Sequence, residues 1–413
     1  MKRNGRPLPR LSTGNARHQV DAAIAPVRAS VQRLRARTWE KLPAPLHPVV
    51  WLGLMLLALA VPAFDDTWMR MFFIVGLYAT LGLGLNVVVG MAGLLDLGYV
   101  AFFATGAYTV AIFGSPVSPN IDGQLNYWIL LPMGIGVGAL AGVLLGLPVL
   151  PLRGDYLAIV TLGFGEIIRI CALNMNDWTN GSSGLFEIAK PGVGFRQVDD
   201  VRAFYVMVIV AGFLVWFVTS RLRDSRVGRA WEAIREDEDV AAGMGINTTR
   251  YKLMAFAIGA SCGALGGAIY APFIDFVAPQ SFDLSVSINV LALVIIGGMG
   301  STQGVIAGSL ILMGTPELLQ FQETRDFLAN FGWLRDFLNL LVDGFNFITR
   351  LDVSGLPPAE EWGKKLALYR FIVYGLLLVL VMVVRPSGLF PSRRRRLEFE
   401  EPAGPGGPAG ERP

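Results

Sequence analysis

The chain has 413 residues, of which 53% are hydrophobic and only 16% are charged, and its formal net charge is +3. Soluble domains carry about 25% charged residues, so this composition excludes an ordinary water-soluble protein and favours a membrane protein. The apolar runs are continuous and lack the period-two alternation of a transmembrane β-barrel, which excludes that class. We therefore expect an all-α fold, a polytopic bundle of transmembrane helices that includes interrupted helices.

The first predicted elements are a basic N-terminal segment and a long series of membrane spans. Residues 1–47 hold ten Lys and Arg and only two acids, and their apolar residues recur at helical spacing. This pattern predicts either an interfacial helix lying on anionic lipid or a disordered basic tail. A helical crossing needs about 20 apolar residues, and about ten runs within residues 48–390 meet or approach this length. They are residues 48–64, 70–89, 92–113, 127–150, 156–173, 201–220, 251–273, 284–298, 302–315 and 370–384.

Two of these spans meet at a glycine-rich interruption within residues 76–114. No polar loop separates them, and non-helical backbone at membrane depth occurs only where protein or a water-filled cavity shields it. We predict a break that lines a transport pathway; a tight hairpin packed on its neighbours is the alternative. A second glycine-rich junction at 295–304 faintly repeats the first, as paired interruptions do in carriers. The pathway candidates from the two regions are Asn86, Gly90, Gly93, Asp96, Tyr99, Gly297 and Gly298.

Three further polar residues fall inside predicted spans. Glu166 and Arg169 are three residues apart, which puts them on one helix face, where they form a self-contained ion pair or bind a zwitterionic substrate. Asn289 is a third pathway candidate. For Asp96, a helix cap is the alternative to substrate contact. Cys171 and Cys262 have neither metal nor redox spacing, so we interpret them as small core residues.

The segment 221–250 is a long charged stretch between two apolar runs. Basic residues concentrate there, in residues 1–47 and in the run 393–396. The positive-inside rule therefore places this loop and both termini in the cytoplasm, which agrees with ten crossings. Within the segment 221–250, residues 230–240 predict a helix with mixed charges, which is suited to docking in the groove of a soluble partner. A solvated connector is the alternative.

The rest of the chain offers no catalytic chemistry. The insert 316–369 is predicted to lie on the outer membrane surface, and the Pro- and Gly-rich tail 391–413 is predicted to be disordered. No phosphate-binding loop, nucleophile elbow, zinc motif or acid–base cluster is present in the sequence. We therefore expect no enzymatic activity, no metal, no cofactor bound by this chain and no nucleic-acid partner.

Residues 229–247 resemble the coupling-loop motif of branched-chain amino-acid permeases in bacterial ABC importers. Three further motifs, at residues 84–98, 152–166 and 297–308, resemble motifs of that family and agree with it in their order and spacing. The second of them favours the LivM-type subunit over its LivH-type sister. The resemblance covers roughly residues 70–390.

This resemblance implies a multi-pass protein of the bacterial inner membrane that forms half of a translocation pathway. Its expected partners are a second, LivH-type permease subunit, two cytoplasmic ATPases that use ATP and Mg, a periplasmic amino-acid-binding protein and membrane lipid. The resemblance also implies which residues couple the chain to the ATPases. They are Arg229, Glu232, Arg235, Glu236, Asp237, Glu238, Ala241, Ala242, Gly243 and Gly245. Replacing Glu236, Asp237 and Glu238 by alanine is then expected to weaken ATPase association.

Two departures from the family leave the cargo and the docking protein open. The insert 316–369 is extra, and Asp96 stands where many relatives have Ser. A urea or short-amide importer permease shares these motifs and is the nearest alternative. An ATP-independent carrier or channel is the alternative from another class.

Overall fold

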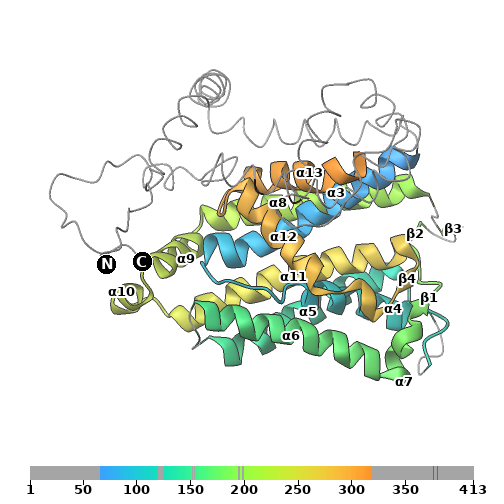
Figure 1. Cartoon of the computed structure of the whole chain (residues 1–413), viewed down its shortest axis with the longest axis horizontal. Coiled ribbons are helices and arrows are strands. Elements are labelled where there is room, and N and C mark those ends of the chain that lie inside the picture. The colour runs from blue at the N-terminus through green and yellow to red at the C-terminus, as the bar shows by residue number, and fades with distance from the viewer. Residues whose placement is uncertain are drawn as a thin grey trace, which may run out of the picture. The chain divides into compact units, whose positions relative to one another are not determined.

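The computed structural model describes residues 66–119, 124–150, 152, 154–193, 196–197 and 200–318, together with Gly375 and Val379. Within these ranges the protein is mostly helical (Figure 1). The predicted N-terminal segment 1–47, the first predicted span and the tail 391–413 lie outside them. So do nearly all of the last predicted span and all but the start of the insert 316–369.

Six helices in the described part of the chain are long and apolar enough to cross a membrane. Each falls on one of the ten predicted runs, which supports a polytopic helical membrane fold; the predicted number of ten is not reached among the described residues. The six are Trp68–Met91, Tyr127–Val149, Asp155–Asn174, Val201–Arg223, Thr248–Ile274 and Pro279–Gly297.

The predicted span 92–113 is not one helix. Helix α3 (Asp66–Leu85) continues into a π-helical turn, η2 (Asn86–Met91), and the chain then runs without regular helix to Tyr99. Helix α4 (Val100–Gly114) has only 15 residues, fewer than the roughly 20 that a full crossing needs. The sequence prediction of a continuous span was therefore wrong, because hydropathy does not register the glycines that end the helix.

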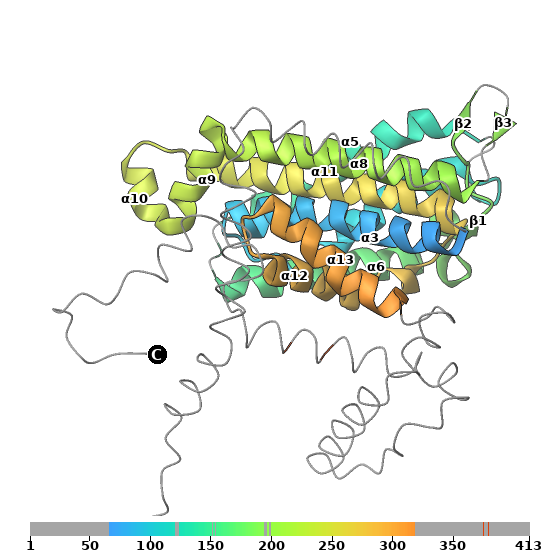
Figure 2. The same cartoon turned by 90° about the horizontal axis from the view of Figure 1, so that it is seen from above.

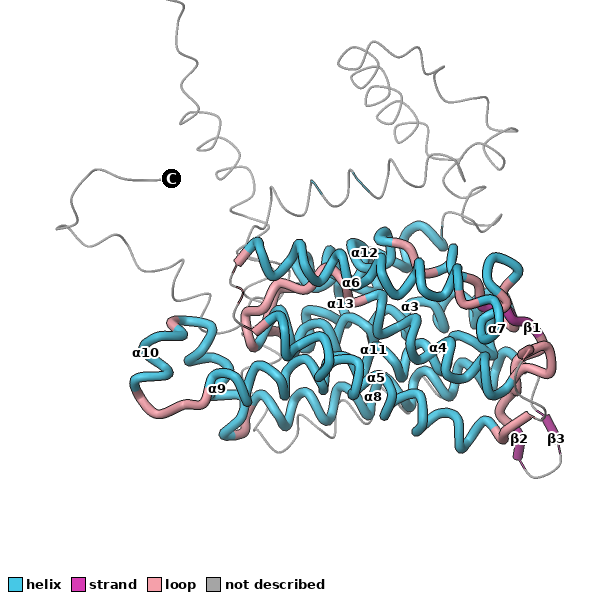
Figure 3. Tube along the Cα trace, turned by 90° about the horizontal axis from the view of Figure 1, so that it is seen from below, coloured by secondary structure: helices cyan, strands magenta, loops and turns pink. Residues whose placement is uncertain are grey.

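Helix α11 (Thr248–Ile274) is the central element of the bundle. It packs against α4 and α5 (Tyr127–Val149), and also against α3 and α8 (Val201–Arg223), as Figures 1 and 3 show. Gly106 of α4 lies directly on the backbone of Ala264, where a Cβ would overlap the Ala264 carbonyl. Small residues at such contacts allow membrane helices to approach closely. Of the two cysteines, Cys262 of α11 is buried as expected, whereas Cys171 is exposed, so that interpretation was wrong.

The remaining helices form the outside of the bundle. α12 (Leu284–Gly297) and α13 (Thr302–Leu318) pack on each other and on α3, while α6 (Asp155–Asn174) packs on α4 and α5. α5, α6 and α8 present large apolar side chains outward, including Leu140, Ile159 and Leu214. Such faces are typical of helices that contact lipid or another membrane subunit.

The two ends of the bundle differ (Figures 1 and 2). One end carries short elements, among them the antiparallel pair β1–β4, in which Leu185 lies opposite Val277, and the hairpin β2–β3. The other end carries α9 (Arg226–Glu236) and α10 (Glu238–Gly243), which extend beyond the long helices. The short elements are α7 (Asn176–Thr179), η3 (Gly181–Ser183), β1 (Leu185–Phe186), β2 (Gly192–Val193), β3 (Arg196–Gln197), β4 (Phe276–Val277) and η4 (Pro279–Ser281).

Candidate functional site

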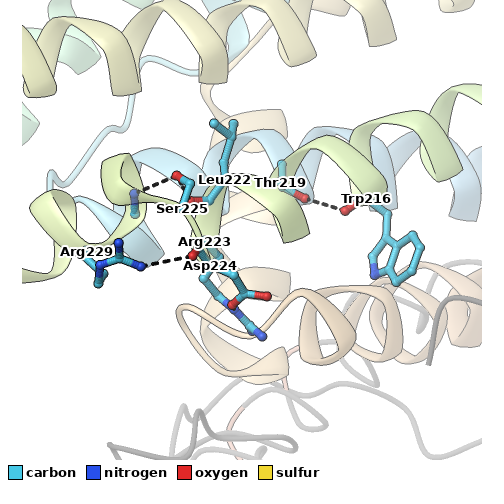
Figure 4. A network of polar contacts seen from close by, with 8 residues as sticks. Trp216, Thr219, Leu222, Arg223, Asp224, Ser225 and Arg229 are labelled. Carbon is cyan, nitrogen blue, oxygen red and sulfur yellow. Dashed lines mark hydrogen bonds and ion pairs between the residues drawn. The ribbon is translucent and has the colours of Figure 1, made fainter. Parts of the chain in front are cut away.

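The turn between α8 and α9 is held by a local hydrogen-bond network (Figure 4). The Ser225 hydroxyl caps α9 by accepting from the N–H groups of Val227 and Gly228, and it donates to the Leu222 carbonyl at 2.6 Å. Arg229 Nη1 donates to the Asp224 carbonyl at 3.2 Å. A serine cap stabilises a helix by about 1 kcal/mol, and here it also fixes the turn. α9 is therefore firmly attached to α8.

One face of α9 is buried against the end of the bundle. Trp231 is fully buried, and Ala230 and Ile234 are buried beside it. The Trp231 indole N–H donates to the Tyr251 carbonyl at 2.7 Å, which attaches α9 to the first turn of α11. Trp231 is not among the coupling residues that the family resemblance implied. Its signal in the sequence is a tryptophan in an otherwise charged loop.

A sharp bend separates α9 from α10, although the sequence predicted one helix over 230–240. Asp237 lies at the bend in an extended conformation and caps α10 by accepting from the N–H groups of Asp239 and Val240. Glu238 then forms an ion pair with Lys252 of α11 at 2.5 Å. The Lys252 side chain is only 4% exposed and that of Glu238 is 22% exposed. This pair attaches α10 to α11.

Replacing Glu238 by alanine is expected to destabilise the fold by on the order of 3 kcal/mol, because it leaves the Lys252 ammonium buried without its counter-charge. The double variant Glu238→Ala with Lys252→Met removes both charges and is expected to recover most of that loss. Thermal unfolding of the purified protein in detergent measures both. An unchanged midpoint in the single variant would show that the pair contributes nothing.

Arg235 joins α9 to the interruption after α3. Its Nη1 donates to the Gly90 carbonyl at 2.6 Å, and its side-chain carbons lie against Gly93. Gly93 has φ +74°, a backbone conformation that favours glycine. A Cβ there would also lie 2.6 Å from Arg235 Cγ. Both constraints require glycine, and together these contacts connect the α9 helix to the π-helical turn.

The π-helical turn in turn contacts the junction between α12 and α13. The Oδ1 of buried Asn86 accepts from the Gly300 N–H at 2.8 Å, although 214 positions separate the two residues. Gly298 and Gly300 have φ +110° and +80°, so the chain bends sharply there. Gly90 packs against Gly300. The two glycine-rich interruptions noted in the sequence therefore lie against each other. We refer to Asn86, Gly90, Gly93, Gly298 and Gly300 as the glycine joint.

Asp96 and Tyr99 lie farther along the interruption and hold the start of α4. Asp96 is fully buried, and its Oδ1 accepts from the Gly98 N–H at 2.9 Å. The Tyr99 hydroxyl donates to the Gly259 carbonyl of α11 at 3.0 Å. The Asp96 carboxylate therefore accepts from the loop that precedes α4 and not from the helix itself, whose N-cap residue is Tyr99, so Asp96 does not cap α4.

The other pathway candidates are spread over the bundle. Glu166 and Arg169 form an ion pair with each other on an exposed face of α6. Asn289 lies on α12 and lines the same cavity as Tyr78 of α3. Gly297 ends α12 and packs on Gly304 of α13.

The coupling candidates differ in exposure, and Arg235 and Asp237 are exposed although they make the contacts described above. Ala241 is buried, whereas Arg229, Glu236, Ala242, Gly243 and Gly245 are exposed and Glu232 is half-buried. Two apolar residues absent from the predicted set are prominent here. Val240 within α10 is 61% exposed, and Met244, which directly follows α10, is 80% exposed. An exposed apolar pair on a short helix at the edge of the molecule is typical of a protein-contact surface.

Comparison with known proteins identifies the family. Residues 68–342 match the family described as "branched-chain amino acid transport system / permease component". The chain belongs to this family. It is 38% identical to the high-affinity branched-chain amino acid transport system permease protein LivM of Salmonella typhimurium, over 78% of this chain and 70% of that protein. It is 37% identical to LivM of Escherichia coli, over 80% of this chain and 71% of that protein.

A more distant likeness links the chain to the sister permease. It is 26% identical to LivH of Salmonella typhimurium, over 59% of this chain and 81% of that protein. No solved structure matches the chain. Family membership and six apolar helices make the chain a multi-pass membrane permease component, and they confirm the resemblance drawn from residues 84–98, 152–166, 229–247 and 297–308.

Proposed function

We propose that the chain is the LivM-type permease subunit of an ATP-driven importer in the bacterial inner membrane, and that it forms half of the pathway for leucine, isoleucine and valine. The names of its relatives support the substrate class. The observation that carries the mechanism is the hydrogen bond from Arg235 to the Gly90 carbonyl. It connects a helix that extends beyond the bundle to an interrupted helix inside it.

In this proposal α9 and α10 face the cytoplasm, as do both termini, and receive two ATPase subunits. The ATPases bind ATP and Mg, and the chain itself binds no cofactor. When the ATPases close, α9 is displaced and carries with it the three parts of the bundle to which it is attached. Ser225, Trp231 and Arg235 provide the connections to α8, α11 and the glycine joint, respectively. The backbone angles of glycine change at low steric cost, so we place the opening and closing of the pathway at the glycine joint.

The opposite end, with β1–β4 and β2–β3, would then face the periplasm and receive the binding protein. A LivH-type subunit would cover an apolar face of the bundle and complete the pathway. The few basic residues at that end agree with this orientation.

The proposal is tested by uptake of labelled leucine, valine and urea into vesicles that carry the reconstituted system. We expect ATP-dependent leucine and valine uptake that disappears when this subunit is omitted. Uptake of urea alone would replace the cargo and support the short-amide alternative. Uptake by this chain without ATPases would support a carrier or channel and contradict the importer.

A further inference from the structure

A cavity of about 380 Å³ lies between α3, α11, α12 and α13, apart from the glycine joint. Small-molecule sites occupy about 300–1,000 Å³ and combine mostly apolar walls with a few convergent polar groups. This cavity has that composition. Four helices contribute to its lining, so its shape depends on how those helices are arranged.

Four polar side chains, one from each of the four helices, line the cavity. They are Tyr78 of α3, Tyr270 of α11, Asn289 of α12 and Glu317 of α13. All four are half-buried, so they are neither core residues nor fully solvated. Ionisable and polar residues in membrane helices face a cavity or pair with other polar groups, and here they gather around one cavity.

The apolar wall is made by aromatic and aliphatic side chains. The rings of Phe73 and Phe273 stack with their centroids 3.7 Å apart and an interplanar angle of 20°. Arg70 places its guanidinium carbon 5.9 Å from the Phe273 centroid. Leu77 and Leu312 complete the wall from α3 and α13. The cavity therefore combines an apolar surface with a carboxylate, an amide and two phenols.

We infer that this cavity binds the transported amino acid, a zwitterion with an aliphatic side chain, on its way through the subunit. This inference rests on the proposed function and adds the site at which the permease itself recognises its cargo. The Glu317 carboxylate pairs with the α-ammonium group. The Tyr78 hydroxyl and the Asn289 amide donate to the α-carboxylate, and the aliphatic side chain packs on the Phe73–Phe273 pair.

The assignment of charges follows from chemistry. A carboxylate only accepts hydrogen bonds, so Glu317 suits the ammonium end, while phenol and amide groups also donate and therefore suit the carboxylate end. Such a site selects against ligands that lack either charged group, because they make fewer charge-assisted hydrogen bonds with it. An aliphatic wall adds preference for leucine, isoleucine and valine over glycine.

The test uses the assembled complex of the permease subunits and ATPases in lipid nanodiscs, without the binding protein, and measures equilibrium binding of labelled ligands. The ligands are leucine, N-acetyl-leucine, which lacks the ammonium group, and leucinamide, which lacks the carboxylate. The variants are Glu317→Gln and Asn289→Ala. The matched control is Leu310→Ala, since Leu310 lies on α13 but is 53% exposed on another face.

We expect saturable leucine binding that weakens at least tenfold in Glu317→Gln, while N-acetyl-leucine binds equally well to the variant and the original protein. Asn289→Ala is expected to weaken leucine but not leucinamide, and Leu310→Ala to change neither. This pairing of variant and ligand separates recognition from folding, because a misfolded protein would lose every ligand. Unchanged leucine binding in both variants would overturn the site. ATP-driven leucine uptake by a complex with no saturable leucine binding would overturn it too, yet leave the importer function intact.

Discussion

Replacing Arg235 by alanine is expected to lower ATP-driven uptake by about 10- to 100-fold while the ATPases remain bound. The variant removes the hydrogen bond from the guanidinium to the Gly90 carbonyl, which connects α9 to the glycine joint. Hydrogen bonds to charged groups contribute about 1.5–3 kcal/mol, and each 1.4 kcal/mol corresponds to a factor of ten in rate. Uptake and ATPase activity measured on the same vesicles distinguish a loss of coupling from a loss of ATPase binding. We expect ATP hydrolysis to continue while leucine uptake falls.

The matched control is Arg250→Ala, which removes an exposed arginine at the same end of the bundle without touching the joint. Gly93→Ala tests the same connection from the other side, because its Cβ would displace the Arg235 side chain and strain a backbone at φ +74°. We expect it to reduce transport as Arg235→Ala does. Transport at the original rate in Arg235→Ala would show that motion reaches the joint by another route.

The sequence predicted the helical bundle well because hydropathy depends only on local composition. Six of the predicted runs became apolar helices long enough to span a membrane. It could not locate the end of α3, where the chain passes through a π-helical turn that ends at Met91, two residues before Gly93. Helix type and termination there depend on contacts with Arg235 and Gly300, which are distant in sequence.

The glycine joint shows what a sequence pattern can reveal about a site. The interruption within 76–114 and the junction at 295–304 share only small residues in the sequence. The structure brings them into contact through the Asn86–Gly300 hydrogen bond and the packing of Gly90 on Gly300. By contrast, Glu166 and Arg169 lie on an exposed face of α6 away from the joint. Residues at the joint and residues on an exposed helix face are both polar positions within apolar runs, so the sequence alone does not distinguish them.

The acidic run after α9 shows why one pattern hides several roles. Asp237 caps α10, and Glu238 neutralises the buried Lys252, whereas Glu236 is exposed. Replacing all three by alanine would therefore loosen α10 as well as change its charge. Weaker ATPase association in that variant would not identify a contact. Substitutions at exposed positions that hold neither helix in place give a clearer result.

Val240 and Met244 are such positions. Replacing both by aspartate is expected to lower the fraction of ATPase that co-purifies with the permease at least tenfold, while the permease itself folds and inserts. Both side chains are mostly exposed, so they contribute little to the fold. If they enter an apolar groove of the partner, two buried carboxylates without partners would cost several kcal/mol on binding. Charged residues around them would set orientation and association rate rather than most of the affinity.

The control for this prediction is Met244→Leu, which keeps an apolar side chain of similar size and is expected to retain the ATPase. Thermal unfolding of each purified variant shows whether α10 remains in place, since its Asp237 cap and the Glu238–Lys252 pair are untouched. Retention of the ATPase by the double aspartate variant would mean that the partner contacts the charged face of α9 instead. Loss of the ATPase with an unchanged unfolding midpoint would identify the end of α10 as the main contact, and would explain why a loop of mixed charge contains two exposed apolar residues one helical turn apart.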